Sequence, residues 1–411
     1  MKIVCVGGGP AGLYVAISAK LRDPGHQITV LERDPPMATY GWGVNCRKPL
    51  LDMLHRNDPE SAREISARSV LWQDKQVHVH GADQEGTAFL GGYGYSVGRA
   101  ALLDILARRA SELGVELRYG CQVQDLSELP EADLVVAADG AGSRIRKLHG
   151  EHFGTQVESG RNPYIWLGTD KMFTSLVFCF EQTSAGWIWC HAYPSVEGVS
   201  TCIVECSPET WRGLGLDQLG AGDGVRLLEK IFHGPLDGHS LISSSRGEPA
   251  RWQTFAHVRN QRWYHGRTVL AGDAAHTTHF TLGSGTWLAM ADAVVLAYSL
   301  SQYPDVDGAL REYDQHRRAE LQPIQAAART SMAWFEHPER YLAHDPVSFA
   351  YAMAVRHSDH TPWRYRLHLA TQLAAVRSLR RACNSAQRWH LARRRGKAAL
   401  TAVGISRPTR S

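Results

Sequence analysis

Apolar residues in this chain occur in short runs that end at glycine, a pattern that predicts buried strands. The run at 2–6 leads into the segment GGGPAG, which begins at Gly7. Apolar residues then recur with helical spacing over 13–21, and a second run over 27–31 ends at Glu32. Continuous apolar runs are typical of buried parallel strands, and a spacing of three to four is typical of helices. The first 32 residues therefore predict a strand–helix–strand unit.

Two later apolar runs are also followed by an acid and a glycine. The run at 132–138 is followed by Asp139 and Gly140, and the run at 268–270 is followed one residue later by Gly272 and Asp273. Acids and glycines at the ends of strands are typical of turns that bring backbone N–H groups close to a ligand. These two segments are therefore further candidates for a ligand-binding edge.

The middle of the chain has a different pattern, dense in aromatic and β-branched residues. It predicts strands at 164–168, 176–180, 186–191 and 201–206, which we expect to form an antiparallel sheet over a substrate pocket. The end of the chain has helical periodicity, with Leu369, Leu373, Val376, Leu379 and Ala382 three or four residues apart. The predicted fold is α/β: a Rossmann-type domain, an interleaved antiparallel-sheet domain and a helical C-terminal segment.

The spacing of the first glycines indicates dinucleotide binding. Gly7 suits the tight turn, Gly9 the approach of a pyrophosphate, and Gly12 the close packing of the helix. Glu32 follows Gly12 by 20 residues, where an acid can bind an adenosine ribose. A tight turn without a ligand is the alternative interpretation. The spacing does not tell which dinucleotide is bound.

Composition narrows the class of protein further. With 411 residues, the chain exceeds the length of about 250 to 300 at which one core stops growing, so we expect two domains. No apolar run approaches the roughly 20 residues of a membrane span, and the first run is too short for a signal peptide, so we expect a cytoplasmic protein. The eight cysteines include no Cys-x-x-Cys, and the 20 histidines form no metal-binding motif. We therefore expect no metal.

Charge is distributed unevenly. From Arg356 to the end, the sequence has 13 Lys and Arg residues and one acid, Asp359, which leaves 32 basic and 40 acidic residues before it. The basic tail is interpreted either as the solvated face of a docking helix or as a site for phosphates or an acidic partner protein. We expect no nucleic-acid partner, because Trp389 is the one aromatic residue interleaved with the basic cluster.

The three strand-end elements, in this order, resemble those of the group A flavoprotein monooxygenases, the aromatic-hydroxylase family typified by p-hydroxybenzoate hydroxylase. In that family the first glycine turn holds the ADP part of FAD. The Asp-Gly element contacts both FAD and NAD(P)H, and the Gly-Asp element binds the flavin ribityl chain. The resemblance covers nearly the whole chain and implies FAD as cofactor, with NADH or NADPH as a co-substrate. The sequence has one Gly-x-Gly-x-x-Gly, as expected where NAD(P)H has no domain of its own.

The resemblance also implies which residues contact the cofactor. Arg99 opens a helical stretch and matches the family position that contacts the pyrophosphate, although a surface arginine at a helix start is the alternative. The cofactor-binding candidates are Gly7, Gly9, Ala11, Gly12, Glu32, Arg33, Gly43, Arg99, Asp139, Gly140, Gly272, Asp273, Gly283, Gly285 and Thr286.

Four stretches are similar to a subgroup that includes salicylyl-CoA 5-hydroxylase and the tryptophan-hydroxylating enzyme of violacein biosynthesis. They are GWGV from Gly41, GRNPYIWLGT from Gly160, HAYP from His191 and HFTLGSGT from His279. The region from Ser331 onward resembles the thioester hydroxylase more closely. Together with the basic tail, it favours an aromatic acyl thioester on CoA or a carrier protein as the substrate. Tryptophan, an indole or a free aromatic acid is the alternative.

The resemblance implies that NAD(P)H reduces FAD, that reduced flavin and O2 form a C4a-hydroperoxide, and that an electron-rich ring attacks its distal oxygen. Because the cofactor carries this chemistry, we expect a dry, aromatic pocket and no catalytic triad. His279, His191 and Tyr193 are the candidates for a catalytic role, and each is also a candidate for structural hydrogen bonding. A flavin reductase, a flavin halogenase and a non-catalytic flavoprotein are the rival functions.

The sequence predicts a discontinuous domain organisation. The FAD-binding domain is expected at 1–80, 97–150 and 266–325, and the substrate domain at 81–96 and 151–265. The helical segment with the basic tail is expected at 326–411. Either a monomer or a homodimer is compatible with this pattern.

Overall fold

The strand–helix–strand pattern at the start of the chain forms the centre of a parallel sheet, as predicted. The computed structural model describes residues 1–386, apart from residues 37, 39–40, 47, 246–247 and 359–360. The sheet has the strand order β18-β19-β9-β1-β2-β8 and is parallel except for the pair β18 and β19. Its strands are β1 (Lys2–Val6), β2 (Gln27–Glu32), β8 (Glu116–Tyr119), β9 (Leu134–Ala137), β18 (Tyr264–His265) and β19 (Thr268–Leu270).

The order of this sheet places the three strand-end elements next to one another. Strand β9 lies between β1 and β19, and all three run parallel. Because parallel strands present their carboxyl ends at the same edge, the turns that follow β1, β9 and β19 meet there. Ligands of open α/β sheets bind at this edge.

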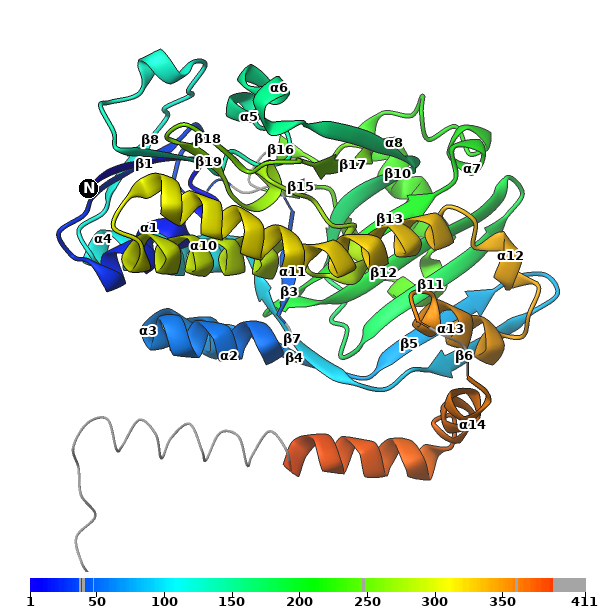
Figure 1. Cartoon of the computed structure of the whole chain (residues 1–411). Helices are drawn as coiled ribbons and strands as arrows, with labels where there is room; N and C mark the ends of the chain where they lie inside the picture. Colours follow the sequence, from blue (N-terminus) through cyan, green and yellow to red (C-terminus); the bar gives the residue numbers. More distant parts are fainter. Residues whose placement is uncertain (37, 39–40, 47, 246–247, 359–360, 387–411) are drawn as a thin grey trace, which may run out of the picture.

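Helices cover the first sheet and are covered in turn by a long helix (Figure 1). Helix α1 (Pro10–Arg22) packs against α4 (Arg99–Glu112) and α10 (Gly285–Gln302), and α11 (Val306–Phe335) packs on α10. Nine consecutive residues of α1, from Ala11 to Ala19, are buried, because other elements surround this helix. The smaller helices of this part are α2 (Lys48–Asn57), α3 (Pro59–Ala67), α5 (Arg144–Leu148) and α6 (Gly150–Phe153), with a 3-10 turn η1 (Leu126–Glu128).

The aromatic, β-branched middle of the chain forms a second sheet, as predicted. Its order is β14-β10-β13-β12-β11-β5-β6, with β17 on β10, and its neighbours are antiparallel except for β11 and β5. The strands are β5 (Lys75–His80), β6 (Glu85–Phe89), β10 (Gln156–Thr169), β11 (Leu176–Thr183), β12 (Gly186–Val196), β13 (Val199–Cys206), β14 (Leu241–Ile242) and β17 (Gln253–Arg259). Strand β5 lies in this sheet, although residues 75–80 fall in the range expected for the FAD-binding domain. The division into domains stays a prediction.

Apolar clusters cover both faces of the second sheet. One face packs against α7 (Pro208–Gly213), α8 (Ala221–Ile231) and α9 (His233–Leu236), and the other packs against the end of α11 and α13 (Pro346–Val355). A three-stranded sheet of β3 (Gly43–Cys46), β7 (Tyr93–Gly98) and β4 (Val70–Gln73) is separate from both large sheets, and β15 (Ser244–Ser245) pairs with β16 (Glu248–Pro249). The remaining elements are the 3-10 turns η2 (Gly272–Ala274) and η3 (Phe280–Leu282) and the helices α12 (Glu339–Leu342) and α14 (Pro362–Ala370).

The periodic stripe predicted over 369–382 does not form one continuous docked helix. Helix α14 ends at Ala370, and a second helix, the C-terminal helix, begins at 374 and is described as far as 386. Leu369, Leu373 and Leu379 are 43%, 61% and 65% exposed, so their side chains do not pack on the body. No helix of the described residues is long and apolar enough to cross a membrane.

Candidate active site

A cavity of about 920 Å³ lies where the carboxyl edge of the first sheet meets the second sheet. Its walls come from β3, β7, the strands β10 to β13, β17, the start of α10 and the end of α13. Nine of the predicted cofactor-binding residues line it: Gly9, Ala11, Gly43, Arg99, Gly140, Asp273, Gly283, Gly285 and Thr286. His191 and Tyr193 line it too, whereas His279 does not.

The first glycine turn owes its shape to close backbone contacts. Gly7 has φ +110°, and a Cβ built on it would lie 2.3 Å from the carbonyl oxygen of Ala138. A Cβ on Gly12 would lie 2.0 Å from the carbonyl oxygen of Gly7. The Glu32 carboxylate accepts a 2.6 Å hydrogen bond from the backbone N–H of Gly8. Gly7, Gly12 and Glu32 therefore shape the turn without lining the cavity.

A buried arginine joins the other two turns. Arg146 Nη1 donates to the carbonyl oxygen of Ala274 at 2.9 Å, and its Nη2 donates to that of Ala141 at 2.5 Å. The Asp139 carboxylate accepts from the Ser143 hydroxyl at 2.5 Å and from the Arg144 backbone N–H at 2.7 Å. Asp139 therefore orders its own turn and does not line the cavity. Arg33 lies on the surface beside Asp34, outside the cavity lining.

A buried acid, Asp292, holds the Gly272 turn in place through a hydrogen bond. The Asp292 carboxylate on α10 accepts hydrogen bonds from the Gly272 N–H at 2.9 Å and from Arg317 Nε at 2.8 Å, and its oxygen lies 2.8 Å from His276 Nε2. Burial alone would raise the pKa of Asp292, but the charges of His276 and Arg317 lower it below its usual value. The sequence analysis missed this support, because partners 16 to 25 residues apart leave no local signal.

The cavity is rich in donors that no protein group satisfies. Arg99 Nε is buried and has no hydrogen-bond partner among the described residues. Helices α1 and α10 both begin at the cavity, directly after the N-cap residues Gly9 and Ser284, and neither start is capped by a side chain. Unpaired N–H groups at helix starts and a guanidinium attract phosphate. These donors suit an anionic dinucleotide.

One acid faces these donors. The Asp273 side chain is accessible from the cavity, yet the protein surrounds it closely enough for burial to raise its pKa. Burial also lowers the pKa of Arg99. The positive charge of Arg99 lowers the pKa of Asp273, and the negative charge of Asp273 raises the pKa of Arg99, so each charge opposes the effect of burial on the other group. A carboxylate beside the phosphate-binding groups suits the hydroxyl groups of a sugar or ribityl chain.

Comparison with known proteins decides the class of ligand. Residues 122–328 match a family model described as FAD binding domain. The chain is 39% identical over 368 residues to salicyloyl-CoA 5-hydroxylase of Streptomyces sp, an alignment that covers 87% of this chain and 70% of that protein. The chain belongs to the FAD-binding-domain family. The predicted family and cofactor are confirmed.

Two further matches agree with this assignment. A 3-hydroxy-4-methyl-anthranilyl-[aryl-carrier protein] 5-monooxygenase of Streptosporangium sibiricum is 36% identical over 335 residues, which cover 82% of this chain and 89% of that protein. The crystal structure of a mutant 2-methyl-3-hydroxypyridine-5-carboxylic acid oxygenase has a TM-score of 0.65 at 19% identity, covering 87% of this chain and 96% of that chain. The predicted α/β fold is confirmed. The protein is an FAD-dependent monooxygenase.

Aromatic side chains of this FAD-dependent monooxygenase form the other wall of the cavity. Phe280 lies 4.5 Å from Tyr164 and 5.4 Å from His191, measured between ring centroids, and Phe178 lies 5.5 Å from His191. His191 Nε2 is buried without a hydrogen-bond partner among the described residues. Tyr193 donates its hydroxyl proton to the carbonyl oxygen of Gly43 at 2.9 Å. His191 is therefore a polar residue in an apolar wall, whereas Tyr193 holds β3 in place.

His279 is connected to the cavity through a chain of polar side chains. Its Nδ1 lies 2.8 Å from the Thr281 hydroxyl, which lies 2.8 Å from the Ser331 hydroxyl. Arg356 Nε donates to the same Ser331 hydroxyl at 2.7 Å. Arg356 lines the cavity and lies over the Phe335 ring at 5.4 Å. The sequence analysis missed Arg356, because it lies in the C-terminal segment, far along the chain from every cofactor element.

Because His191 and His279 are buried, we expect the protein to lose stability in mild acid. Burial lowers the pKa of both His191 and His279 to about 3. Below the ordinary histidine pKa of about 6.5, the unfolded chain binds these two protons and the folded chain does not, so stability falls as the pH decreases toward 3. Each histidine contributes about 1.4 kcal/mol per pH unit in that window. Chemical denaturation of the flavin-bound protein between pH 7.5 and 5.0 measures the slope.

A matched pair of variants isolates this effect. His279→Gln is expected to reduce the slope, whereas His344→Gln, at an exposed position, leaves it unchanged. An unaltered slope in His279→Gln would show that other groups cause the acid sensitivity.

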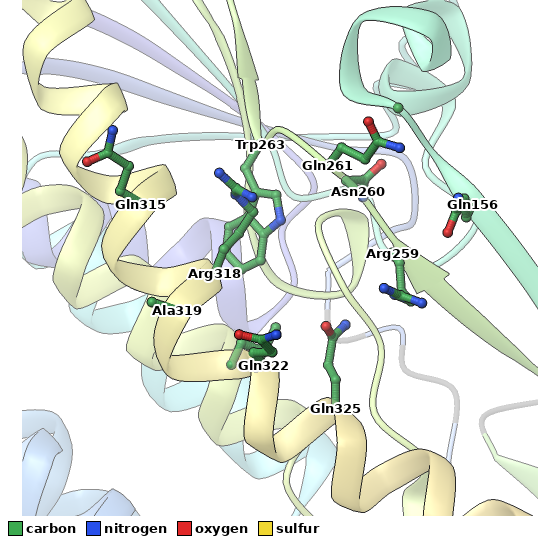
Figure 2. A pocket seen from close by; sticks show the side chains of 12 residues that line it. Gln156, Arg259, Asn260, Gln261, Trp263, Gln315, Arg318, Ala319, Gln322 and Gln325 are labelled. Carbon is green, nitrogen blue, oxygen red and sulfur yellow. The ribbon is translucent and has the colours of Figure 1, made fainter.

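A second, smaller cavity of about 480 Å³ lies between α11 and the segment after β17. Figure 2 shows Gln315, Gln322 and Gln325 on α11, opposite Arg259 and Gln261. This smaller cavity is lined by none of the predicted site residues. Its Arg318 makes a two-bond ion pair with Asp314 at 2.7 and 2.8 Å. The large cavity is therefore the candidate active site.

Proposed function

We propose that this FAD-dependent monooxygenase hydroxylates the ring of an aromatic acid held as a thioester of phosphopantetheine, on coenzyme A or on a carrier protein. The observation that carries the proposal is one continuous cavity with donors for a dinucleotide at one end and an aromatic wall at the other. The names of two relatives, an acyl-CoA hydroxylase and an aryl-carrier-protein monooxygenase, support the thioester.

The residues that we propose to hold FAD line the part of the cavity next to the first sheet. The backbone from Gly9 to Ala11 and the guanidinium of Arg99 would hold the phosphates, Asp273 the ribityl hydroxyls, and the start of α10 the flavin end. The chemistry that bound FAD supplies is acceptance of a hydride from NAD(P)H and activation of O2.

The remaining residues orient the ring and exclude water. Phe178, Tyr164 and Phe280 provide flat apolar contacts for an aromatic ring. His191 stays neutral near pH 7, because burial and the charge of Arg356 lower its pKa to about 3. A neutral imidazole has one unprotonated ring nitrogen, which can accept a hydrogen bond from a ring hydroxyl without adding charge. Arg356 provides a positive charge for an oxygen that becomes negative during hydroxylation.

A substrate panel tests the proposal. NAD(P)H oxidation is followed with salicyloyl-CoA, anthraniloyl-CoA, the two free acids and tryptophan, and each product is analysed by mass spectrometry under labelled O2. We expect a thioester to gain one oxygen atom, with kcat/KM roughly tenfold or more above that of its free acid, since the arm adds binding contacts.

The same panel separates the rival functions. A flavin reductase or a non-catalytic flavoprotein inserts no oxygen, and a halogenase needs halide. Turnover of tryptophan or a free acid, without turnover of any thioester, contradicts the proposal and leaves the FAD assignment intact.

A further inference from the structure

Exposed apolar side chains gather at the C-terminal end of the described chain. Among the described residues, thirteen large apolar side chains are strongly exposed, and five of them lie between 363 and 379. They are Trp363, Leu367, Leu369, Leu373 and Leu379, with exposed fractions from 43% to 65%. Isolated exposed apolar residues are ordinary, but a group on two successive helices and the turn between them indicates an interaction surface.

The same surface is strongly basic. Residues 361–386 contain five arginines and no acid. Arg380 and Arg381 are exposed on the C-terminal helix, and Arg381 lies 3.7 Å from the buried carboxylate of Asp74. We call α14 and the C-terminal helix together the basic–apolar surface. Its composition fits a partner that is acidic and has apolar side chains of its own.

The basic–apolar surface lies against the wall of the candidate active site. The Gln372 side chain pairs with the backbone of Phe89, accepting from its N–H at 2.9 Å and donating to its carbonyl oxygen at 2.8 Å. The Arg377 guanidinium lies 3.9 Å over the Phe89 ring. A Cβ on Gly91 would lie 2.6 Å from Arg380 Cζ, and Gly91 lines the cavity. Gly91 therefore separates the cavity from the surface. Figure 1 shows the C-terminal helix, in orange-red, continuing from α14.

We propose that the basic–apolar surface docks an acidic carrier protein that delivers the aromatic acid on its phosphopantetheine arm. This inference rests on the proposed function and deepens it by naming the source of the thioester. The arm would have to cross the cavity wall at the segment around Gly91 to bring the aromatic acid to the aromatic wall, while the carrier stays outside.

The size and charge of the surface favour a protein over the other occupants. The described part of the C-terminal helix, 13 residues long, spans about 20 Å, and α14 extends the surface further. Free coenzyme A would use the arginines but has no large apolar face to cover Leu373 and Leu379. A second copy of this chain would bring five arginines against five, and such like charges repel.

The test compares three thioesters of one acid: salicylate on a stand-alone aryl carrier protein, salicyloyl-CoA and salicyloyl-pantetheine. We expect Arg380→Glu to raise KM for the loaded carrier roughly tenfold or more at low salt, with kcat unchanged, because like charges then face each other. KM for salicyloyl-pantetheine, which has neither carrier nor phosphates, stays the same. Leu379→Ser, at a 65% exposed position, raises KM for the carrier without a change of charge.

The matched control is Arg226→Glu on α8, an exposed arginine paired with Asp223, which leaves all three KM values unchanged. Flavin absorbance and circular dichroism confirm that each variant is folded. A carrier KM that Arg380→Glu and Leu379→Ser leave unaltered overturns the inference. So does an increase confined to salicyloyl-CoA, or a change of oligomeric state in sedimentation. In these cases thioester turnover still supports the proposed function, whereas no turnover of any thioester contradicts that function itself.

Discussion

Replacing Gly12 with alanine is expected to lower the free energy of unfolding by about 3 kcal/mol or more, because overpacking against fixed atoms is costly. The added Cβ would lie 2.0 Å from the carbonyl oxygen of Gly7. Gly7 cannot give way: its N–H donates to the carbonyl oxygen of Leu31 at 2.8 Å, and Ala138 lies close on its other side. The variant is therefore expected to purify without flavin or to aggregate. Denaturant unfolding and flavin content measure the two effects.

The neighbouring glycine provides a matched control. A Cβ on Gly9 meets no atom within 4 Å, and its φ of −76° is open to every residue. Gly9→Ala is therefore expected to keep the fold and to lose only affinity for FAD, since Gly9 lines the cavity. Equal stability of Gly12→Ala and Gly9→Ala would show that the turn can relax, contrary to this account.

Replacing Arg99 with methionine is expected to have opposite effects on the flavin-free and flavin-bound protein. Without a ligand, Arg99 keeps a buried Nε that has no partner among the described residues, and methionine removes that cost of about 1 kcal/mol. With FAD, the variant loses a charged hydrogen-bond donor worth about 2 kcal/mol, or roughly thirtyfold in Kd. A titration of FAD into the apoprotein measures the loss of FAD affinity, and the melting temperature of the apoprotein measures the gain in its stability.

Arg108→Met on the same helix is the control for Arg99→Met. Arg108 is exposed and forms an ion pair with Glu64, so we expect no change in FAD affinity. In both variants the positive charge of Arg146 still acts on the Asp273 carboxylate. An Arg99→Met variant that binds FAD as tightly as the natural protein would place the phosphates elsewhere in the cavity.

Most of the cofactor end of the site could be predicted from local patterns. The spacing of Gly7, Gly9 and Gly12 predicts a turn before a helix, because only glycine tolerates the left-handed φ of Gly7 and the backbone contact at Gly12. The predicted strands of both sheets are confirmed for the same reason, since alternation and apolar runs reflect which faces are buried. The role of each cofactor-binding residue stays a prediction.

The substrate end could not be predicted in the same way. Met353 on α13 and Arg356 directly after this helix reach the cavity. The hydrogen-bonded chain from Arg356 through Ser331 and Thr281 to His279 links residues up to 77 positions apart. The sequence also suggested a docked apolar stripe over 369–382, but the break after Ala370 and the exposed leucines contradict it. Helical periodicity indicates that one face of a helix is apolar, but it does not indicate whether another element covers that face.

The sequence by itself therefore determined the turns, the strands and the binding of a dinucleotide, because each depends on residues that are close together in the chain. The tertiary structure alone decided that the turns after β1, β9 and β19 meet at one edge, and that His191 lines the cavity while His279 stays behind it. The physical reason is that strand order and side-chain burial arise from packing between segments distant in the chain. No local spacing of residues encodes such packing.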